Sequence, residues 1–286
     1  MSDFDYNQAF SRNIGWLTPD EQLLLKTKRV AIAGLGGVGG KHLLTMTRLG
    51  IGHFHIADPD VFEQVNFNRQ AGASLRHIGA KKSDTLKAMA LDINPELTIQ
   101  AFPEGIDPSN IDAFLEGVDL YVDGLDYFVV NARRMVFDAC ARRGIPAVTA
   151  APLGMGVAIL NFLPGGMTFE EYFRLEGHTE EEQLIRFLIG LSPRLLQRPY
   201  LVHPAAVDFS AHKGPSTPMA TDLCAGMAAT QVLKILTGRG KVLAAPWGFQ
   251  MDAFRNKFVK TWRPMGNRNP LQRLAIHIAT KILSRK

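Results

Sequence analysis

Apolar runs alternate with amphipathic stretches along the first half of the 286-residue chain. Runs without polar alternation predict buried strands, at 28–33, 52–57, 97–102, 118–123, 146–151 and 155–163. Helical periodicity predicts the intervening helices, at 38–49, 80–92, 108–115 and 129–143. Strands that are apolar on both faces and separated by helices are typical of a parallel sheet covered on both sides. The pattern therefore predicts an α/β fold with a doubly wound, mainly parallel sheet.

The pattern changes after Pro164. A long excursion follows, with an amphipathic helix at Glu180–Leu191, then a helix from Thr221-Asp222 to Gly238 and a hairpin over 246–262 that turns at Arg255-Asn256. We divide the chain into an N-terminal arm with a short helix starting at Thr18 (1–27), an α/β domain (28–163), a crossover excursion (164–220), a return helix and hairpin completing the domain (221–269), and a basic amphipathic C-terminal helix (270–286).

The C-terminal helix places an apolar stripe on one face, formed by Leu271, Leu274, Ala275, Ile278 and Ile282. Such a basic amphipathic helix can dock on its own domain, across a dimer, or on a membrane surface. The sequence leaves these alternatives open.

Composition is that of a globular protein, with 46% hydrophobic and 21% charged residues. The net charge of +5 permits an anionic partner, including nucleic acid, without requiring one. The two cysteines, Cys140 and Cys224, lie far apart and form neither a disulfide framework nor a CxxC metal pair. The acidic amino terminus has no apolar run of the kind found in secretory signals. We therefore expect a cytoplasmic protein.

A glycine-rich motif follows the first strand and precedes the first long helix. Its glycines are Gly34, Gly36, Gly37 and Gly39, in the pattern GxGxxG. Such a turn lets the backbone approach a phosphate at a helix N-terminus, which indicates a Rossmann-like nucleotide site. Asp58 ends the second strand, where a carboxylate usually accepts hydrogen bonds from ribose hydroxyls. These features allow both NAD and ATP.

The residues beyond Asp58 favour ATP. The next loop carries Asp60, Asn66, Arg69 and Gln70, close to the carboxyl ends of the strands. Arg69 is a bidentate donor and Lys82 a second cation, both suited to a triphosphate. Asp126, just after the fourth strand, is an acid that could hold Mg²⁺. Each alone could be a solvated or capping residue, but together along one strand edge they predict a shared site.

These residues carry a resemblance to the ThiF/MoeB/HesA family of ubiquitin-activating-like adenylyltransferases. It spans roughly residues 8–163, with weaker matching over Thr221–Gly238. The resemblance implies that Asp58 holds the ribose and that the phosphates are bound by Asn66, Arg69 and Lys82. It also implies that Asp126 holds Mg²⁺ and that an arginine from the arm of the other subunit of a homodimer completes the site. Arg12 is the candidate for that arginine.

The implied reaction is ATP-dependent adenylation of a carboxylate, with release of pyrophosphate. The implied substrate is the C-terminus of a ubiquitin-like carrier protein or a peptide. The chain departs from the family where relatives carry two zinc-binding CxxC pairs, so no zinc is expected. Tyr127 and Asn131 stand where relatives often have asparagine and arginine. The crossover loop lacks the cysteine of several relatives, which leaves Cys224 as a candidate nucleophile in the predicted first helical turn, or as a core residue.

Three rival functions remain open. A tRNA threonylcarbamoyladenosine dehydratase would use the same fold, and the basic tail and net charge would suit tRNA. An NAD(P)-dependent oxidoreductase explains the glycine motif and Asp58 but leaves Arg69, Lys82 and Asp126 without a role. A non-catalytic scaffold subunit is the third. In the excursion, His203, His212 and Lys213 could line a substrate channel or simply be exposed.

Overall fold

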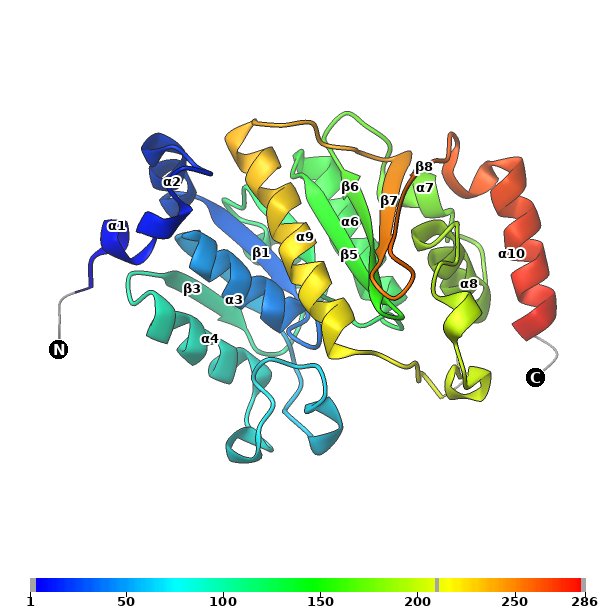
Figure 1. The fold of residues 1–286 in the computed structure, drawn as a ribbon, viewed down its shortest axis with the longest axis horizontal. Helices are drawn as coiled ribbons and strands as arrows, with labels where there is room; N and C mark the ends of the chain where they lie inside the picture. Colours follow the sequence, from blue (N-terminus) through cyan, green and yellow to red (C-terminus); the bar gives the residue numbers. More distant parts are fainter. Residues whose placement is uncertain (1–3, 209–210, 284–286) are drawn as a thin grey trace. The chain divides into compact units, whose positions relative to one another are not determined.

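The computed structural model describes residues 4–208 and 211–283 (Figure 1). The chain forms two compact units. Unit 1 comprises Met1–Leu125 and Ala225–Val242, and unit 2 comprises Asp126–Cys224 and Leu243–Lys286. Residues 1–3 of the predicted arm, 209–210 of the excursion and 284–286 of the predicted C-terminal helix lie outside the described residues.

Unit 1 contains a parallel sheet in the order β3-β2-β1-β4. Its strands are β1 (Arg29–Ala33), β2 (His53–Ala57), β3 (Thr98–Phe102) and β4 (Leu120–Asp123). Ala31 on β1 pairs with His55 on β2 and with Tyr121 on β4. All four strands lie within the predicted ranges. Parallel strands end at the same edge of the sheet, so the residues after β1 and β2 are brought together there.

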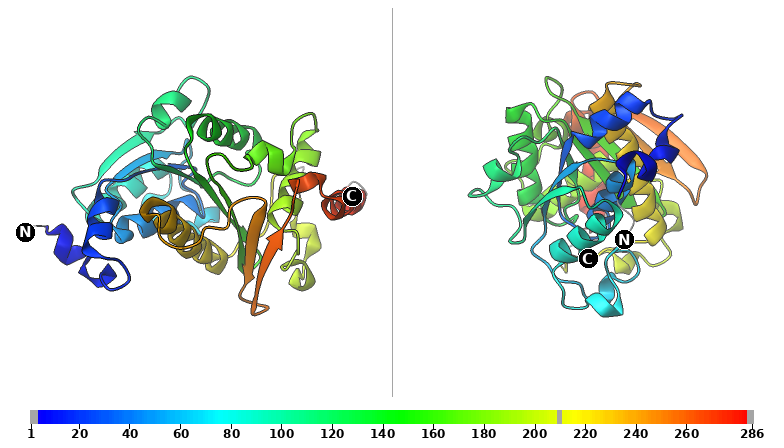
Figure 2. Two further views of the ribbon diagram at one scale, coloured as in Figure 1. Left: turned by 90° about the horizontal axis from the view of Figure 1, so that it is seen from above. Right: turned by 90° about the vertical axis from the view of Figure 1, so that its left-hand side faces the viewer.

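Three helices of unit 1 connect these parallel strands. They are α3 (Gly39–Leu49), α4 (Lys82–Ile93) and α5 (Ile111–Phe114). Right-handed crossovers place α3 and α4 on one face of this sheet and α5 on the other (Figure 2). His55 Nδ1 lies 2.8 Å from the Phe114 carbonyl oxygen, which joins β2 to α5. The predicted helices are confirmed, although α5 is a single turn.

The N-terminal arm packs on its own unit. It contains α1 (Tyr6–Ala9) and α2 (Pro19–Lys26), and the latter starts at Thr18 as predicted, with a reciprocal cap from Glu21. Tyr6 is buried, and its hydroxyl donates to the Gly50 carbonyl at 2.6 Å while accepting from Gln22 Nε2 at 2.9 Å. These buried bonds fix the arm beside the end of α3.

Unit 2 contains an antiparallel meander in the order β5-β6-β7-β8. The strands are β5 (Ala147–Leu153), β6 (Gly156–Phe162), β7 (Trp247–Asp252) and β8 (Lys257–Trp262). The predicted hairpin over 246–262 is confirmed, with Asn256 at its turn in the left-handed region. The helices of this unit are α6 (Val130–Arg143), α7 (Phe169–Phe173), α8 (Glu180–Leu191) and α10 (Pro270–Leu283). Aromatic rings from α6, β6, α7 and α8 pack together, including Phe137, Phe162, Phe169 and Phe187.

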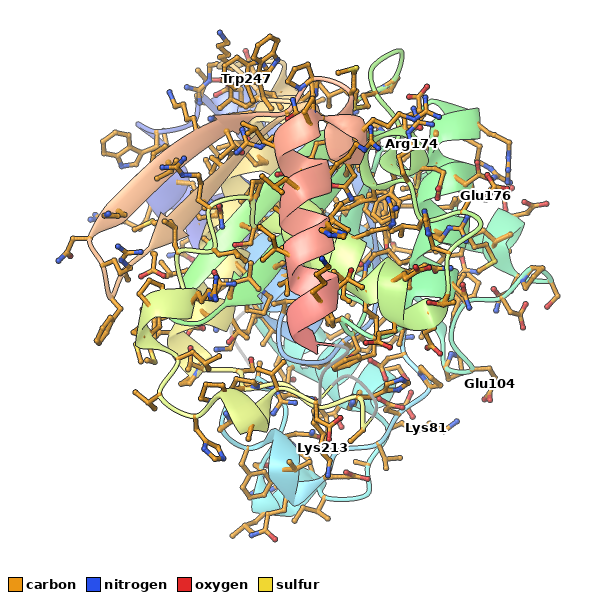
Figure 3. All side chains as sticks on the ribbon, turned by 90° about the vertical axis from the view of Figure 1, so that its right-hand side faces the viewer. Lys81, Glu104, Arg174, Glu176, Lys213 and Trp247 are labelled. Carbon is orange, nitrogen blue, oxygen red and sulfur yellow. The ribbon has the colours of Figure 1, made fainter. Side chains whose placement is uncertain are left out.

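The C-terminal helix α10 docks on its own unit. Gln272 is buried and donates to the Ile189 carbonyl of α8 at 3.1 Å. The apolar side chains Leu271, Leu274 and Ile278 remain largely exposed, and Figure 3 shows α10 along this face of unit 2. In the described part of the chain, no helix combines the length and apolarity needed to cross a bilayer.

The helix that carries Cys224 begins earlier than predicted. α9 spans Pro218–Thr237, so the expected start at Thr221-Asp222 is wrong. Thr217 Oγ1 accepts from Ala220 N at 3.4 Å, and Pro218 occupies the first helical position, where its missing N–H costs nothing. Cys224 therefore lies about two turns inside α9, beyond the first turn where a helix dipole lowers a thiol pKa.

Candidate functional site

The glycine-rich turn of unit 1 is closely packed. Gly34 has φ of +83°, and a Cβ added there would overlap the carbonyl of Gly124, the residue directly after β4. A Cβ at Gly39 would overlap the Gly34 carbonyl oxygen. The three glycines thus let β1, β4 and the start of α3 meet. The sequence did not predict this role of Gly124, although a glycine directly after a buried strand can indicate a close approach of another backbone segment.

Gly36 differs from these packing glycines. The nearest atom to a Cβ added there would be Gln70 Nε2, at 3.6 Å. Gln70 is buried, and its Oε1 has no hydrogen-bond partner among the described residues. An open glycine beside a buried, unsatisfied amide fits the approach of a polar ligand such as a nucleotide.

Asp58 fastens the end of β2 to this turn. Its Oδ2 accepts from Leu35 N at 2.6 Å, and its Oδ1 accepts from Asp60 N at 2.8 Å. The side chain is buried, and burial raises the pKa of Asp58 while the charge of Lys82 acts against that shift. Each carboxylate oxygen has a second lone pair, so these bonds leave acceptor capacity for ribose hydroxyls.

Lys82 at the start of α4 forms a part-buried ion pair. Its Nζ lies 2.8 Å from Asp60 Oδ2, and its side chain is only 7% exposed. Its backbone N–H also donates to the Asp60 carbonyl, at 3.0 Å. The preceding Lys81 is 49% exposed and lies 3.6 Å from the mostly exposed Glu104 (Figure 3). Lys82, unlike Lys81, is therefore held against the acids of the predicted site.

Asn66 organises the loop that carries Arg69 and Gln70. Its Oδ1 accepts from Glu63 N at 3.0 Å, and its carbonyl accepts from the backbone N–H groups of Arg69 and Gln70. The half-buried guanidinium of Arg69 donates to the Val65 carbonyl and to Asn68 Oδ1, at 3.0 and 2.9 Å. Among the described residues, no carboxylate pairs with Arg69. Its positive charge is therefore available for an anion.

Arg12 and Asp126 occupy other places in the chain. Arg12 is exposed in the 3₁₀ turn Ser11–Asn13 of the docked arm, and no described residue pairs with its side chain. Asp126 is exposed in unit 2, three residues beyond β4, and its Oδ1 accepts from Phe128 N at 3.0 Å. Unit 1 alone thus brings together the glycine turn, Asp58, Asp60, Gln70 and Lys82.

Arg133 on α6 holds the turn at Asp126, a role that the sequence did not reveal. Its Nη2 donates to the Asp126 carbonyl at 3.0 Å, and its guanidinium lies 4.7 Å from the centre of the Phe187 ring. The side chain is 2% exposed. Tyr127 is also anchored, since its hydroxyl donates to the Leu184 carbonyl at 2.5 Å, and burial raises its pKa. Asp126 therefore stands on a turn fixed from both sides.

A cavity of about 440 Å³ in unit 2 is lined by residues that follow Asp126 and by His212 of the excursion. The His212 ring stacks on Phe128, with ring centres 5.0 Å apart. His203 is exposed elsewhere on the excursion. Of the two histidines, His212 is the one placed where a substrate channel could use it.

The two cysteines are buried. Burial raises the pKa of Cys140 to about 12, as expected for a structural thiol. Cys224 is fully buried in α9, which does not favour its candidate role as a nucleophile. The described residues contain no group of three or more His, Cys, Asp or Glu side chains arranged to hold a metal ion.

Comparison with known proteins shows which family the chain belongs to. The ThiF family pattern matches residues 10–274. The chain belongs to the ThiF family. This confirms the resemblance drawn from the glycine motif and the residues beyond Asp58.

The curated relatives of this ThiF family chain have several functions. The SAMP-activating enzyme E1 of Haloferax volcanii is 30% identical over 133 residues, covering 46% of this chain and 48% of that protein. The tRNA threonylcarbamoyladenosine dehydratase of Haemophilus influenzae is 32% identical over 152 residues, which cover 52% of this chain and 57% of that protein. The chain thus spans about half the length of the curated relatives it matches.

Solved structures support the fold class. PaaA superposes with a TM-score of 0.68 at 19% identity, covering 91% of this chain and 76% of that one. The structure of E. coli MccB with ATP superposes with a TM-score of 0.66 at 20% identity, and the match covers 92% of this chain and 74% of that one. These likenesses confirm the predicted Rossmann-like α/β fold of this ThiF family chain.

Two alanine substitutions test which glycines of the turn are needed for backbone packing. Gly39→Ala forces a Cβ onto backbone, so we expect a loss of about 3 kcal/mol or more in the free energy of unfolding. Gly36→Ala meets only ordinary van der Waals contact, so we expect a change within about 1 kcal/mol. Urea unfolding followed by circular dichroism measures both. Equal losses would contradict this account of the turn.

Arg133→Ala tests the support of the Asp126 turn. The change removes a buried guanidinium that donates to the carbonyls of Asp126 and Tyr127 and lies over the Phe187 ring, so we expect a loss of about 2–4 kcal/mol in unfolding free energy. Arg142→Ala on the same helix is the control, because its pair with Asp138 is mostly exposed and worth about 0–1 kcal/mol. Thermal and urea unfolding compare the two, and a harmless Arg133→Ala would show that the turn does not depend on this residue.

Proposed function

We propose that this protein is an ATP-dependent adenylyltransferase that activates a carboxylate as an acyl-adenylate. The observation that carries the proposal is the bonded chain in unit 1, in which Asp58 joins the glycine turn to Asp60 and Asp60 pairs with Lys82. A hydride-transfer enzyme needs the first of these links but not the second. Membership of the ThiF family supports the same conclusion.

The residues supply positioning and charge rather than a nucleophile. The open backbone at Gly36 and the amide of Gln70 receive the nucleotide, and Asp58 accepts from its ribose. Lys82 and Arg69 neutralise phosphate charge. The substrate carboxylate attacks the α-phosphorus, a new carboxyl–phosphate bond forms, and the bond to the departing pyrophosphate breaks. Such a reaction depends on alignment and electrostatic stabilisation.

Bound Mg²⁺ would supply further positive charge to the phosphates, and Asp126 is the proposed ligand. The exposed carboxylate of Asp126 uses only Oδ1 in its local turn, at Phe128 N. Its second oxygen is therefore able to face a metal ion. Arg133 would act as a positioning residue, because it fixes the backbone of that turn.

The proposed substrate is the C-terminal carboxylate of a ubiquitin-like carrier protein or a peptide. The relative from Haloferax volcanii, named as a SAMP-activating enzyme, supports a protein substrate of this kind. We further propose a homodimer in which Arg12 of one subunit enters the site of the other. The docked arm supports this proposal, because it presents Arg12 on a fixed turn with an exposed guanidinium.

A tRNA threonylcarbamoyladenosine dehydratase activity is the second candidate. The dehydratase of Haemophilus influenzae matches 52% of this chain, against 46% for the activating enzyme. A net charge of +5 suits an RNA substrate. Turnover of threonylcarbamoyladenosine-containing tRNA, tested beside the exchange assay below, decides between the candidates.

Matched lysines test the adenylation site. In ATP–pyrophosphate exchange with Mg²⁺ and a small-protein extract, we expect Lys82→Ala to lower the rate about 100-fold or more, through lost charge stabilisation. Lys81→Ala, one residue away and exposed, should stay within about twofold. Arg69→Ala and the exposed Arg76→Ala form a second matched pair with the same expectation. Normal exchange in both Lys82→Ala and Arg69→Ala would overturn the site assignment.

Subunit mixing tests Arg12. We expect Arg12→Ala and Lys82→Ala each to abolish exchange, and a co-refolded mixture to recover it, because a mixed dimer contains one site with both residues intact. Self-mixed samples of each variant are the controls. If Arg12→Ala is inactive and mixing gives no recovery while mixed dimers form, Arg12 acts within its own subunit. Full activity of Arg12→Ala would remove it from the site.

A further inference from the structure

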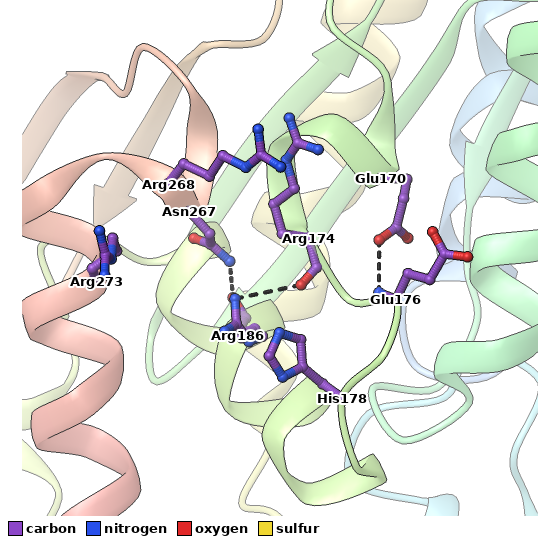
Figure 4. A pocket seen from close by; sticks show the side chains of 8 residues that line it. All are labelled: Glu170, Arg174, Glu176, His178, Arg186, Asn267, Arg268 and Arg273. Atoms are coloured by element: carbon purple, nitrogen blue, oxygen red, sulfur yellow. Dashed lines mark hydrogen bonds between the residues drawn. The ribbon is translucent and has the colours of Figure 1, made fainter.

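Unit 2 contains a cavity of about 380 Å³ whose lining comprises four arginines, two glutamates, a histidine and an asparagine. We call it the arginine pocket and define it by Arg174, Arg186, Arg268 and Arg273 (Figure 4). None of these residues belongs to the proposed adenylation site. The pocket is therefore a separate feature that still needs a ligand or a structural explanation.

The arginines come from elements that buried amides tie together. Arg174 caps the C-terminus of α7 with φ of +54°, and Arg186 lies on α8. Arg268 lies in the 3₁₀ turn Gly266–Arg268, and Arg273 lies on α10. Asn267 is 2% exposed and donates to the carbonyls of Phe173 and Arg186, at 2.7 and 3.0 Å. Arg186 in turn donates to the Arg174 carbonyl, at 3.4 Å (Figure 4). The frame of the pocket is thus built before any ligand arrives.

The lining of the pocket has more positive than negative side chains, because four arginines face only two carboxylates, those of Glu170 and Glu176. Among the described residues, no carboxylate forms an ion pair with any of the four arginines, and Arg174 Nε is buried without a hydrogen-bond partner. Glu170, on the pocket wall, is engaged by Arg134 at 3.0 Å and by the N–H groups of Leu175 and Glu176, both at 2.7 Å. Burial lowers the pKa of Arg186. Glu182 opposes this shift electrostatically without forming an ion pair with Arg186. The remaining excess of positive charge, part of it buried, would be stabilised by a bound anion.

We propose that the arginine pocket binds the phosphoryl group of a small phosphomonoester. Guanidinium groups bind phosphate through paired N–H donors, and a monoester dianion offers three oxygens to several of them at once. A carboxylate offers two oxygens and one charge. A phosphodiester also carries one negative charge, and it has a substituent on each of its two ester oxygens. A concave site of about this volume suits a terminal phosphate with a small body attached.

The experiment is calorimetric titration of the 286-residue chain with glycerol phosphate and with inorganic phosphate. A Lys82→Ala background weakens phosphate binding at the proposed adenylation site. On that background we expect saturable binding, weakened about tenfold or more by Arg268→Gln and by Arg273→Gln. Both side chains are exposed at the rim, so neither change threatens the core. Arg198→Gln, an exposed arginine of the same unit outside the pocket, should bind like the parent.

Several results would overturn the proposal. These are no saturable binding of either phosphate, equal weakening by Arg198→Gln, or competition by acetate as strong as that by inorganic phosphate. A further contradicting result would be that the parent protein does not bind glycerol phosphate, whereas Arg268→Gln and Arg273→Gln weaken its binding of an RNA duplex. The pocket would then bind a phosphodiester. Binding of glycerol phosphate but not inorganic phosphate supports the proposal and shows that the body of the ligand is recognised. Pyrophosphate exchange does not enter this test, so the two proposals can fail separately.

Discussion

The buried carboxylate of Asp58 is the constraint on which the rest of the unit 1 site depends. It accepts backbone N–H groups from the glycine turn at Leu35 and from the next loop at Asp60. Hydrogen bonds to a charged acceptor each contribute about 1.5–3 kcal/mol, which offsets much of the cost of burying the acid. Lys82, paired with Asp60, adds the positive charge that keeps this arrangement electrostatically balanced. The nucleotide turn and the cation are thus positioned through one side chain.

The features that were predicted correctly from the sequence are those that depend on local residue patterns. Strands and helices followed from periodicity, and the tight turn followed from Gly34 and Gly39, whose backbone positions exclude a Cβ. Gly124 and Arg133 act through segments distant in sequence, so their roles needed the folded chain. The sequence also could not show that Lys82 is enclosed, since burial at a helix start changes from one residue to the next.

Two local sequences can each start the helix α9, and the structure uses the earlier one. Thr221-Asp222 is a good cap pair, but Thr217-Pro218 combines a capping hydroxyl with a residue preset for the first helical turn. The four-residue shift moves Cys224 from a helix end, where a thiol is activated, into a buried interior. The burial of Cys224 therefore does not favour the candidate role of its thiol as a nucleophile.

The kind of anion that a basic protein binds depends on where its positive side chains lie. An excess of +5 spread over a surface stripe would favour a nucleic acid backbone. In unit 2, four arginines without carboxylate partners among the described residues instead line one cavity, on a frame fixed by Asn267 and Gln272. A cluster so confined concentrates its field on a single small anion. Part of the positive charge of unit 2 is thus gathered at one cavity, as the proposed binding of a phosphomonoester requires.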